Sequence, residues 1–317
     1  MSPKIVVVGS LNMDLIVTAP KIPLEGETIT GGTFCSLPGG KGANQAVAAS
    51  RLGANVHMVG CVGDDEWGRV LLKNLEQENI ETDYVTISPG ATGVALITVN
   101  QEGNNSIVVA PGANGRMTVE HVRRAESIIR QADLLLIQLE IPMTVVEEAV
   151  RLASHHRVPI ILNPAPAVPL TEELLQRIDI LTPNETEGKL IVTGRAEGNV
   201  EVEEIIFNLV EKGVRQVVMT LGGEGVAYSN EGQIKQLKAH KMEVVDTTGA
   251  GDSFNAGLGV YYAESGHLAD AITFAQDVAA LSVTQFGAQA SMPSRRQVEH
   301  FSSTKPSHGE ELVDEIK

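Results

Sequence analysis

The stretch Asp246-Thr247-Thr248-Gly249-Ala250-Gly251-Asp252 is the most informative part of the chain. It follows an apolar run at 242–245 that is typical of a strand, and it leads into 252–266, where large apolar residues recur at helical spacing. The two glycines allow a sharp turn whose N–H groups can approach a ligand closely. Because the first N–H groups of a helix are unpaired and the helix dipole is positive there, Gly249, Ala250 and Gly251 are predicted to form an anion hole.

Asp252, at the mouth of this turn, has two interpretations. Asp is favoured as the N-cap of a helix. Alternatively, its carboxylate takes a proton from a substrate hydroxyl while the helix end neutralises a transferred phosphoryl group. The stretch alone favours capping, whereas the other motifs of the chain favour catalysis.

The composition is that of an ordinary globular protein. Its 317 residues can bury a large core, with 43% hydrophobic and 20% charged residues. No apolar run approaches the ~20 residues of a membrane helix, and the first residues lack a signal-peptide pattern. Cys35 and Cys61 are too few for a disulfide framework. We therefore expect a cytoplasmic protein without a membrane partner.

The net charge of −16 bears on the choice of ligands. No basic stripe is visible and aromatic residues make up only 3%, so nucleic acid is not expected as a partner. An anionic ligand such as ATP would need local relief from helix N-termini, lysines and metal ions.

Strand-like and helical patterns alternate along most of the chain. Such alternation predicts an α/β fold, a doubly wound, mostly parallel sheet with helices on both faces, whose ligands bind at the carboxyl ends of the strands. The strand-like runs lie at 5–8, 56–59, 134–139, 160–162, 180–181, 217–221 and 226–228. The helical patterns between them lie at 43–52, 68–78, 119–131, 145–154, 202–212 and 268–284.

Two segments, at about 11–37 and 92–109, interrupt this alternation. The first has period-2 stretches with Pro and Gly, and the second predicts a hairpin with a polar turn at 100–105. We expect both to pair into a small β-sheet lid. An exposed sheet needs covering, either by substrate or by another subunit, so the lid is also expected to form a homodimer. The main domain would span 1–301, and the polar, acidic tail 302–317 is expected to be disordered, with a short helix considered at its end.

A second glycine-rich turn is Gly39-Gly40-Lys41-Gly42-Ala43-Asn44. It is not a Walker A loop, because the glycine spacing differs and no Ser or Thr follows Lys41. It is either a tight turn with Lys41 in solvent or a backbone cradle for a small polar ligand, with Asn44 as a hydrogen-bonding side chain. Asn12 and Asp14 follow the first strand, and Asp14 either faces solvent or accepts hydrogen bonds from adjacent hydroxyls of a sugar.

Polar residues also follow later strands. Glu140 comes at the end of 134–139 and faces the predicted ligand crevice. Asn184 and Glu187 are spaced nearly as a capping box, and the alternative is that they position a hydrated Mg²⁺. The stretch Thr220-Leu221-Gly222-Gly223-Glu224-Gly225 is either a hairpin turn or a place where a nucleotide lies against the backbone. Together these motifs predict one site at the strand ends.

These residues resemble the ribokinase-like (PfkB) family of sugar and nucleoside kinases over about 3–301. The resemblance is carried by 9–14 (Gly-Ser-Leu-Asn-Met-Asp), 38–46 (Pro-Gly-Gly-Lys-Gly-Ala-Asn-Gln-Ala), 183–187 (Pro-Asn-Glu-Thr-Glu) and 246–254. It implies a carbohydrate kinase that transfers the γ-phosphoryl group of ATP to O5 of D-ribose, giving D-ribose 5-phosphate and ADP, with Asp252 as general base. Family members also commonly dimerise through the lid.

By matching position, the resemblance implies residues around each ligand. The sugar would contact Asn12, Met13, Asp14, Gly40, Lys41, Gly42, Ala43, Asn44, Glu140 and Asp252. ATP would contact Asn184, Thr220, Leu221, Gly222, Gly223, Glu224, Gly225, Gly251, Asp252 and Gln276, and Glu187 would act on Mg²⁺ through water. A monovalent cation, K⁺, would lie beside Asp246, Thr248, Ser282, Gln285, Gly287 and Ser291.

Three alternatives differ in substrate or class. The acceptor could be 2-deoxyribose, another pentose or a nucleoside. A catalytically inactive sugar-sensing protein would be expected to have lost Asp252 or the glycine turn, and both are present. A dinucleotide-dependent oxidoreductase would need Gly-x-Gly-x-x-Gly after the first strand, which Gly9-Ser10-Leu11 does not provide.

Overall fold

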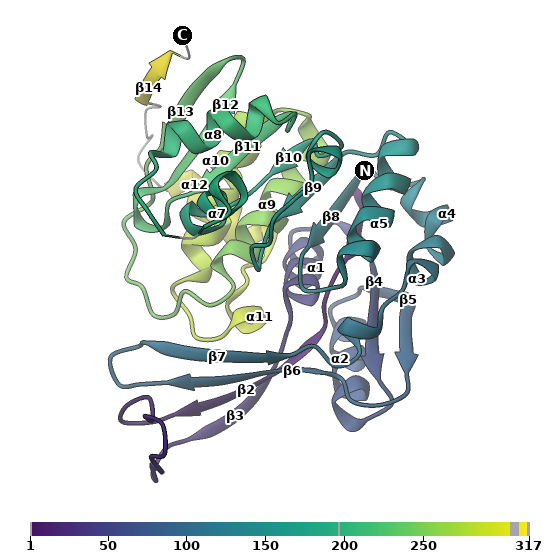
Figure 1. Cartoon of the computed structure of the whole chain (residues 1–317), viewed down its shortest axis with the longest axis vertical. Helices are drawn as coiled ribbons and strands as arrows, with labels where there is room; N and C mark the ends of the chain where they lie inside the picture. The colour runs from purple at the N-terminus through teal and green to yellow at the C-terminus, as the bar shows by residue number, and fades with distance from the viewer. Residues whose placement is uncertain (1, 196, 305–310, 316–317) are drawn as a thin grey trace.

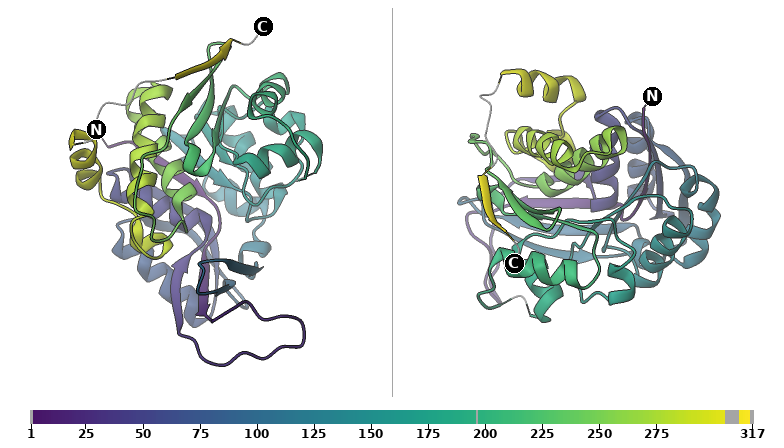
Figure 2. Two further views of the ribbon diagram at one scale, coloured as in Figure 1. Left: turned by 90° about the vertical axis from the view of Figure 1, so that its left-hand side faces the viewer. Right: turned by 90° about the horizontal axis from the view of Figure 1, so that it is seen from above.

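Strand β1 (Lys4–Val8) is covered on both faces, which explains its unbroken apolar sequence. Ile5 and Val7 belong to one buried core, while Val6 and Val8 belong to a second core on the opposite face. The sheet therefore separates two layers of helices, which Figure 2 shows from above. The structure is a computed structural model and describes residues 2–195, 197–304 and 311–315.

The main sheet follows the order β14-β13-β12-β11-β10-β9-β8-β1-β4-β5. Strands from β5 to β11 run parallel to their neighbours, whereas β11 to β14 pair antiparallel. Consecutive strands of this type leave a ligand crevice at their carboxyl ends. Besides β1, the sheet contains β4 (Asn55–Gly63), β5 (Glu81–Ser88), β8 (Leu134–Gln138), β9 (Ile160–Asn163), β10 (Ile180–Leu181), β11 (Gln216–Thr220), β12 (Val226–Asn230), β13 (Gln233–Leu237) and β14 (Glu311–Glu315).

Helices cover both faces of this sheet (Figures 1 and 2). The core around Ile5 and Val7 is closed by α1 (Lys41–Arg51), α2 (Glu66–Gln77), α9 (Ala250–Ser265), α10 (Leu268–Ser282) and α12 (Arg295–Thr304). The opposite core is closed by α3 (Val119–Arg124), α4 (Glu126–Ile129), α5 (Met143–His155), α6 (Glu172–Leu175), α7 (Glu185–Thr193) and α8 (Val202–Glu211). Helix α11 (Ala288–Ser291) and the 3-10 turns Asn114–Arg116 and Gly222–Glu224 complete the described helices. None of the described helices has the length and apolar composition needed to cross a bilayer.

A separate, smaller sheet projects from the body (Figure 1). It consists of β2 (Asn12–Thr18), β3 (Phe34–Gly39), β6 (Gly93–Val99) and β7 (Asn105–Ala110) in the order β3-β2-β6-β7. Strands β2 and β6 pair in parallel, with Asn12 opposite Gly93. Asn12 and Asp14 share one face of β2, because alternate residues of a strand point the same way. Since β2 starts just after β1 ends, these two residues are buried where the smaller sheet joins the carboxyl end of β1.

The α/β class, the helices on both faces of the main sheet and the smaller separate sheet are therefore confirmed. The predicted strand at 242–245 is wrong, because the N–H of Val245 bonds to the carbonyl of Val283 at 2.8 Å instead of joining a ladder. The helix predicted at 119–131 is divided at Ala125 into α3 and α4. Strands β5 and β13 were not predicted from the sequence.

The tail 302–317 lies only partly within the described residues. Residues 302–304 form the end of α12, and 311–315 form β14, which pairs antiparallel with the edge strand β13. Backbone pairing thus takes the place of the expected disorder in 311–315, and a strand stands where a short helix was considered. The expectation for 305–310, 316 and 317 falls outside the described residues.

Candidate active site

Asp252 is the third residue of α9 and does not serve as its N-cap. Gly249 holds the capping position with φ 76°, a conformation that glycine adopts without strain. The side chain of Asp252 is only 6% exposed. Its Oδ2 accepts a hydrogen bond from Nδ2 of Asn44 at 2.9 Å, and its Oδ1 accepts one from Nε2 of Gln45 at 3.1 Å. The capping interpretation is therefore wrong, and the carboxylate is instead held by amides of α1.

The turn before α9 leaves space beside its backbone. A Cβ on Gly251 would meet nothing within 4 Å, whereas one on Gly249 would lie 3.1 Å from Ala288. The carbonyl of Gly251 accepts from Nδ2 of Asn255 at 2.8 Å, and Oδ1 of Asn255 accepts from Oγ1 of Thr182 at 2.6 Å. These contacts fix the first turn of α9 while its N-terminal end remains accessible to an anion.

Lys41, the first residue of α1, is the positive charge of the site. Burial alone would lower the pKa of its ammonium group, but neighbouring carboxylates outweigh burial and raise it. These carboxylates are, in order of decreasing influence, Asp252, Glu140, Glu187 and Asp14. Carboxylates from four different elements or loops thus surround one lysine, which stays protonated near neutral pH.

Asp14 is the most strongly perturbed of the acids. Burial raises its pKa to about 7, with further contributions from the charges of Glu140 and Asp252, while Lys41 acts in the opposite direction. Gly39 on the neighbouring strand makes room for this carboxylate, since a Cβ there would lie 2.6 Å from Oδ1 of Asp14. A carboxylate in this setting is expected to seek hydroxyl donors from a ligand.

Asn12 and Glu140 are oriented by residues that the sequence did not single out for a role. Nδ2 of Asn114 donates to Oδ1 of Asn12 at 2.8 Å, so the amide nitrogen of Asn12 remains available as a donor. Oγ of Ser10 and the N–H of Lys41 donate to Oε2 of Glu140 at 2.5 and 3.1 Å. Ser10 was recognisable only as part of its motif, and Asn114 carried no signal.

The expected nucleotide residues lie at the ends of β10 and β11. An isolated bridge joins Asn184 to Thr220, and Gly222 and Gly223 have open space where a Cβ would stand. Asn184 is the N-cap of α7: its Oδ1 accepts from the N–H of Glu187 at 2.8 Å, and Oε2 of Glu187 accepts from the N–H of Asn184 at 2.9 Å. The predicted capping box is confirmed, and it is compatible with a further role of the carboxylate of Glu187.

The pKa of Glu187 is shifted by its surroundings, and the side chain of Gln276 is held by a hydrogen bond. Burial raises the pKa of Glu187, which the N–H of Asn184 and the charge of Lys41 partly oppose and the charge of Asp252 reinforces. Nε2 of Gln276 donates to the carbonyl of Leu237 at 3.1 Å, so this side chain links α10 to the end of β13.

The residues expected around a monovalent cation form a connected turn. Oδ1 of Asp246 accepts from the N–H and hydroxyl of Thr248 at 2.9 and 2.7 Å, and Oδ2 accepts from the N–H of Gly287 at 2.9 Å. Burial alone would raise the pKa of Asp246, but these hydrogen bonds lower it overall. The hydroxyls of Ser282 and Ser291 donate to carbonyls of their own helices. Within the described residues, no three His, Cys, Asp or Glu side chains gather as a metal-binding cluster.

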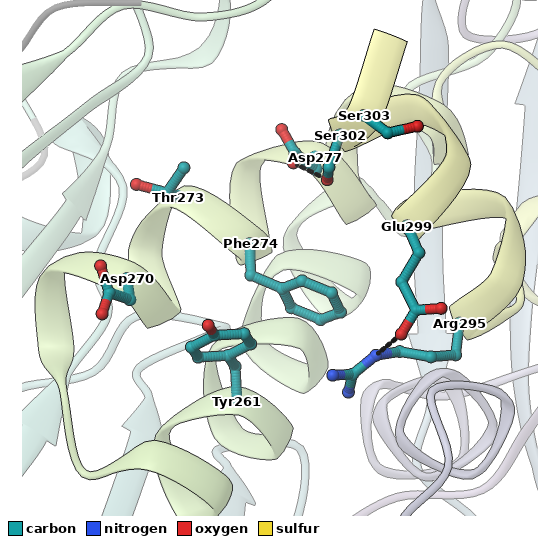
Figure 3. Close-up of a pocket in the computed structure, with 9 residues that line it drawn as sticks. All are labelled: Tyr261, Asp270, Thr273, Phe274, Asp277, Arg295, Glu299, Ser302 and Ser303. Carbon is teal, nitrogen blue, oxygen red and sulfur yellow. Dashed lines mark hydrogen bonds and ion pairs between the residues drawn. The ribbon is translucent and has the colours of Figure 1, made fainter. Parts of the chain in front are cut away.

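A cavity of about 530 Å³ lies apart from these residues, between α9, α10 and α12 (Figure 3). Its wall is built by packing: the guanidinium of Arg295 lies 4.8 Å from the centre of the Phe274 ring, and Tyr261 packs against the same ring. Arg295 also pairs with Glu264 and Glu299. None of the residues predicted for the site lines this cavity.

The doubly wound sheet, the strand lid and the carboxylate at the start of α9 define a small-molecule kinase of the α/β class. The chain belongs to the family described as pfkB family carbohydrate kinase, whose model matches residues 2–295. This confirms the family that the motifs indicated.

Known relatives cover almost the whole chain. It is 44% identical over 300 residues to a ribokinase of Bacillus subtilis, and 41% identical over 302 residues to a ribokinase of Haemophilus influenzae. These alignments cover 94% and 95% of this chain, respectively, and 99% of each relative. A solved structure of Arabidopsis thaliana ribokinase complexed with ribose and ATP is similar with a TM-score of 0.86 and 35% identity, covering 96% of this chain and 100% of the other.

Proposed function

We propose that this protein transfers the γ-phosphoryl group of ATP to O5 of D-ribose, giving D-ribose 5-phosphate and ADP. The observation that carries the proposal is the buried carboxylate of Asp252, held by Asn44 and Gln45 at the start of α9 and close to Lys41. The similarity to ribokinases over nearly the full length supports ribose as the acceptor.

The reaction needs one proton transfer and one phosphoryl transfer. In the proposed mechanism, Asp252 accepts the proton of the O5 hydroxyl as O5 bonds to the γ-phosphorus and the bond to the β,γ-bridging oxygen breaks. The negative charge of the transferred group is proposed to meet the N–H groups of Gly249, Ala250 and Gly251 at the start of α9, of which that of Ala250 also donates to the carbonyl of Thr247 at 3.2 Å. The open space beside Gly251 supports this assignment, because an anion can approach the backbone there.

The sugar is proposed to lie between β2 and α1. Asp14 and Glu140 offer acceptors for its hydroxyls, and Asn12 offers a donor, since its amide oxygen is already engaged by Asn114. Lys41 balances the surrounding carboxylates and contributes to the charge that the incoming phosphates meet. Asn44, beside Asp252, completes this side of the pocket. Met13, Gly40, Gly42 and Ala43 would complete the sugar contacts through the same two segments.

ATP is proposed to lie along the ends of β10 and β11, next to Asn184, Thr220 and the glycines 222–225. Gln276 would flank the base from α10. Mg²⁺ keeps several waters and binds phosphate oxygens, so a single carboxylate acting through water suits it. Glu187 provides such a carboxylate at the start of α7, and the metal would neutralise charge on the transferred phosphate.

We also propose K⁺ as an activating cation beside the glycine turn. The supporting observation is that Asp246 bonds to both Thr248 and Gly287 and so joins the turn before α9 to the segment before α11. An ion held here by carbonyl oxygens, together with Gln285 and Ser291, would steady the N-terminal end of α9. Ser282 lies on the neighbouring helix α10.

The lid is proposed to form a homodimer. Its exposed apolar side chains support this, because Phe34 is 64% and Val108 is 63% exposed. The cytoplasm is the proposed compartment, since ATP is supplied there and Cys35 and Cys61 are free thiols.

The test is an assay of ADP formation with ribose, 2-deoxyribose, other pentoses and adenosine, each in K⁺ and in Na⁺. Ribose should give the highest kcat/KM, and K⁺ should raise it. Asp252→Asn should lower kcat about 10²–10⁴-fold, the contribution of a positioned general base, while ATP binding measured by calorimetry persists. Turnover that prefers another acceptor would replace ribose in the proposal, and a mildly impaired Asp252→Asn enzyme would disprove the base.

A further inference from the structure

Both oxygens of the Asp252 carboxylate are engaged by buried amides. Asn44 donates to Oδ2 and Gln45 donates to Oδ1. Asn44 is 6% exposed and Gln45 is fully buried, so water does not replace these donors readily. The two amides are adjacent on α1, yet each is oriented by a different part of the molecule.

The first branch runs through α11 to α2. Oδ1 of Asn44 accepts from Nε2 of Gln289 at 3.1 Å, and Oε1 of Gln289 accepts from Nδ2 of Asn74 at 2.8 Å. The backbone of Gln289 is also fixed, because its carbonyl accepts from Nη1 of Arg51 at 2.6 Å. Arg51 is held in turn by a two-point ion pair with Glu78.

The second branch runs back into the main sheet. Oε1 of Gln45 accepts from Nε2 of Gln138 at 2.6 Å, at the end of β8. Gln138 is fully buried, and a Cβ on Gly9 would overlap its Oε1, so its amide is confined by backbone. Nε2 of Gln45 also reaches Oδ1 of Asn163 at 3.4 Å.

An amide has one donor end and one acceptor end, so a chain of amides has a direction. Along both branches the amides donate in sequence toward Asp252, apart from the longer contact of Gln45 with Asn163, and an ionised carboxylate can only accept. One donor on each oxygen matches a carboxylate that accepts at both and fixes its plane, which leaves a defined lone pair for the acceptor hydroxyl.

We propose that Gln45 and Gln289 are positioning residues that hold the general base ionised and correctly oriented, Gln45 directly and Gln289 through Asn44. The proposal rests on the role of Asp252 in the proposed function. It adds two residues to the catalytic arrangement, one of them on the short helix α11.

The first experiment compares pH profiles of kcat/KM for the sugar in wild type, Gln45→Met and Gln289→Met. Methionine keeps a similar length but cannot donate. The pH of half-maximal kcat/KM should rise by about one unit in Gln45→Met and by less in Gln289→Met, since donors to a carboxylate favour its charged form. At a pH below the midpoints of both enzymes, kcat of Gln45→Met should be about tenfold lower than that of wild type. The KM for ATP should stay within about twofold of the wild-type value.

A second comparison tests the direction of the branch. In Gln289→Glu, a carboxylate replaces the amide and accepts from Asn44, so the amide of Asn44 must turn its oxygen toward Asp252. Repulsion between these oxygens should make Gln289→Glu shift the profile further than Gln289→Met, although Glu and Gln have nearly the same shape. A Glu variant no worse than the Met variant would overturn the directional argument.

Gln131→Met is the matched control, because Gln131 donates to the carbonyl of Ser127 on the exposed surface. Its profile should equal that of wild type. If a core variant does not fold, Asn74→Ala removes the outermost donor of the first branch and should shift the profile in the same direction. A uniform loss of kcat with an unmoved profile, in any of these folded variants, would reduce the two residues to a structural role.

Failure of the two proposals can be told apart. A wild-type enzyme that does not phosphorylate ribose contradicts the proposed function, and the profiles are then recorded with the acceptor that it does use. Variants that leave the wild-type profile unmoved contradict the positioning role alone.

Discussion

The buried carboxylate of Asp14, which is proposed to bind the sugar, lowers the free energy of unfolding when it is ionised. Its pKa is raised to about 7, chiefly by burial, then by the charges of Glu140 and Asp252, with Lys41 opposing. Between the ordinary pKa near 4 and this raised value, the folded chain binds a proton that the unfolded chain has lost. Stability contributed by this group therefore falls as pH rises through this window, and the full penalty is present above about pH 7.

Replacing Asp14 by Asn should remove this penalty. We expect Asp14→Asn to raise the free energy of unfolding by on the order of 2 kcal/mol at pH 8 and to change it much less at pH 4, where the folded carboxyl is neutral and the unfolded one is only about half ionised. Urea titrations of the ligand-free protein at the two pH values measure this. Sugar affinity should drop in the same variant, and equal effects on stability at both pH values would contradict the argument.

Sequence motifs indicated the residues proposed to contact ligands better than the residues whose side chains hold them in place. Asp252, Lys41 and Asn44 lie in the first turns of α9 and α1, directly after glycine-rich segments whose residue types indicate a site. Gln45 stands next to Asn44 in the same motif, yet nothing local distinguishes it from a core amide. Gln289 is separated from Asn44 by 245 positions, so their contact depends on packing and has no sequence pattern.

At the level of elements, the start of α9 combines a helix end with empty space. Gly251 has an ordinary helical conformation, and a Cβ there would touch no protein atom within 4 Å. Fold and activity can therefore be separated at this position, because alanine favours a helix more than glycine does.

We expect Gly251→Ala to raise the free energy of unfolding by about 0.5–1 kcal/mol, since Ala loses less backbone entropy. The same methyl group would occupy the place proposed for the transferred phosphate, so kcat should fall by about 10²-fold or more. Thermal unfolding and steady-state kinetics on one preparation measure both. Gly249→Ala is the contrast, because φ of 76° makes any side chain strained and should destabilise the fold. Unimpaired turnover in Gly251→Ala would remove the anion hole from this turn.

Helices and strands were predicted well where the hydrophobic pattern has one clear period. They were predicted poorly where pairing with a neighbouring strand decides whether a strand forms. Strand β1 and helix α5 follow clear patterns. The apolar run 242–245 suggested a strand, but Val244 and Val245 are exposed and no neighbouring strand is available to them. Strand β5 was missed because its half-buried, alternating sequence is weak by comparison, and it forms only through its parallel ladder with β4.

At the scale of the whole molecule, the lid raises the question of what covers it. Strand β7 is exposed along its length, with Ile107 and Val108 on opposite faces at 52% and 63% exposure. Apolar side chains on an exposed edge favour association. The sequence indicated both lid segments and their pairing, but not the parallel register of β2 with β6, which depends on how the body brings them together.

We expect light scattering to show that the wild-type protein is a dimer. Ile107→Lys and Val108→Lys place a charge on opposite faces of β7, so only the variant whose charge lies in the dimer interface should be a monomer. The variant whose charge lies on the face of β7 outside the interface should remain a dimer and serves as the control. A wild-type monomer, or a dimer that survives both changes, would contradict association through the lid.

The position of Asn12 and Asp14 at the start of β2 has a consequence for ATP hydrolysis in the absence of sugar. Asn12 and Asp14 belong to the first residue pairs of β2 in the sheet that forms the lid, and Asn12 lies opposite Gly93. Under the proposed function, a sugar bound to both side chains would be tied to the base of this sheet, whereas water offers a single oxygen. We therefore expect little hydrolysis of bound ATP in the absence of the sugar.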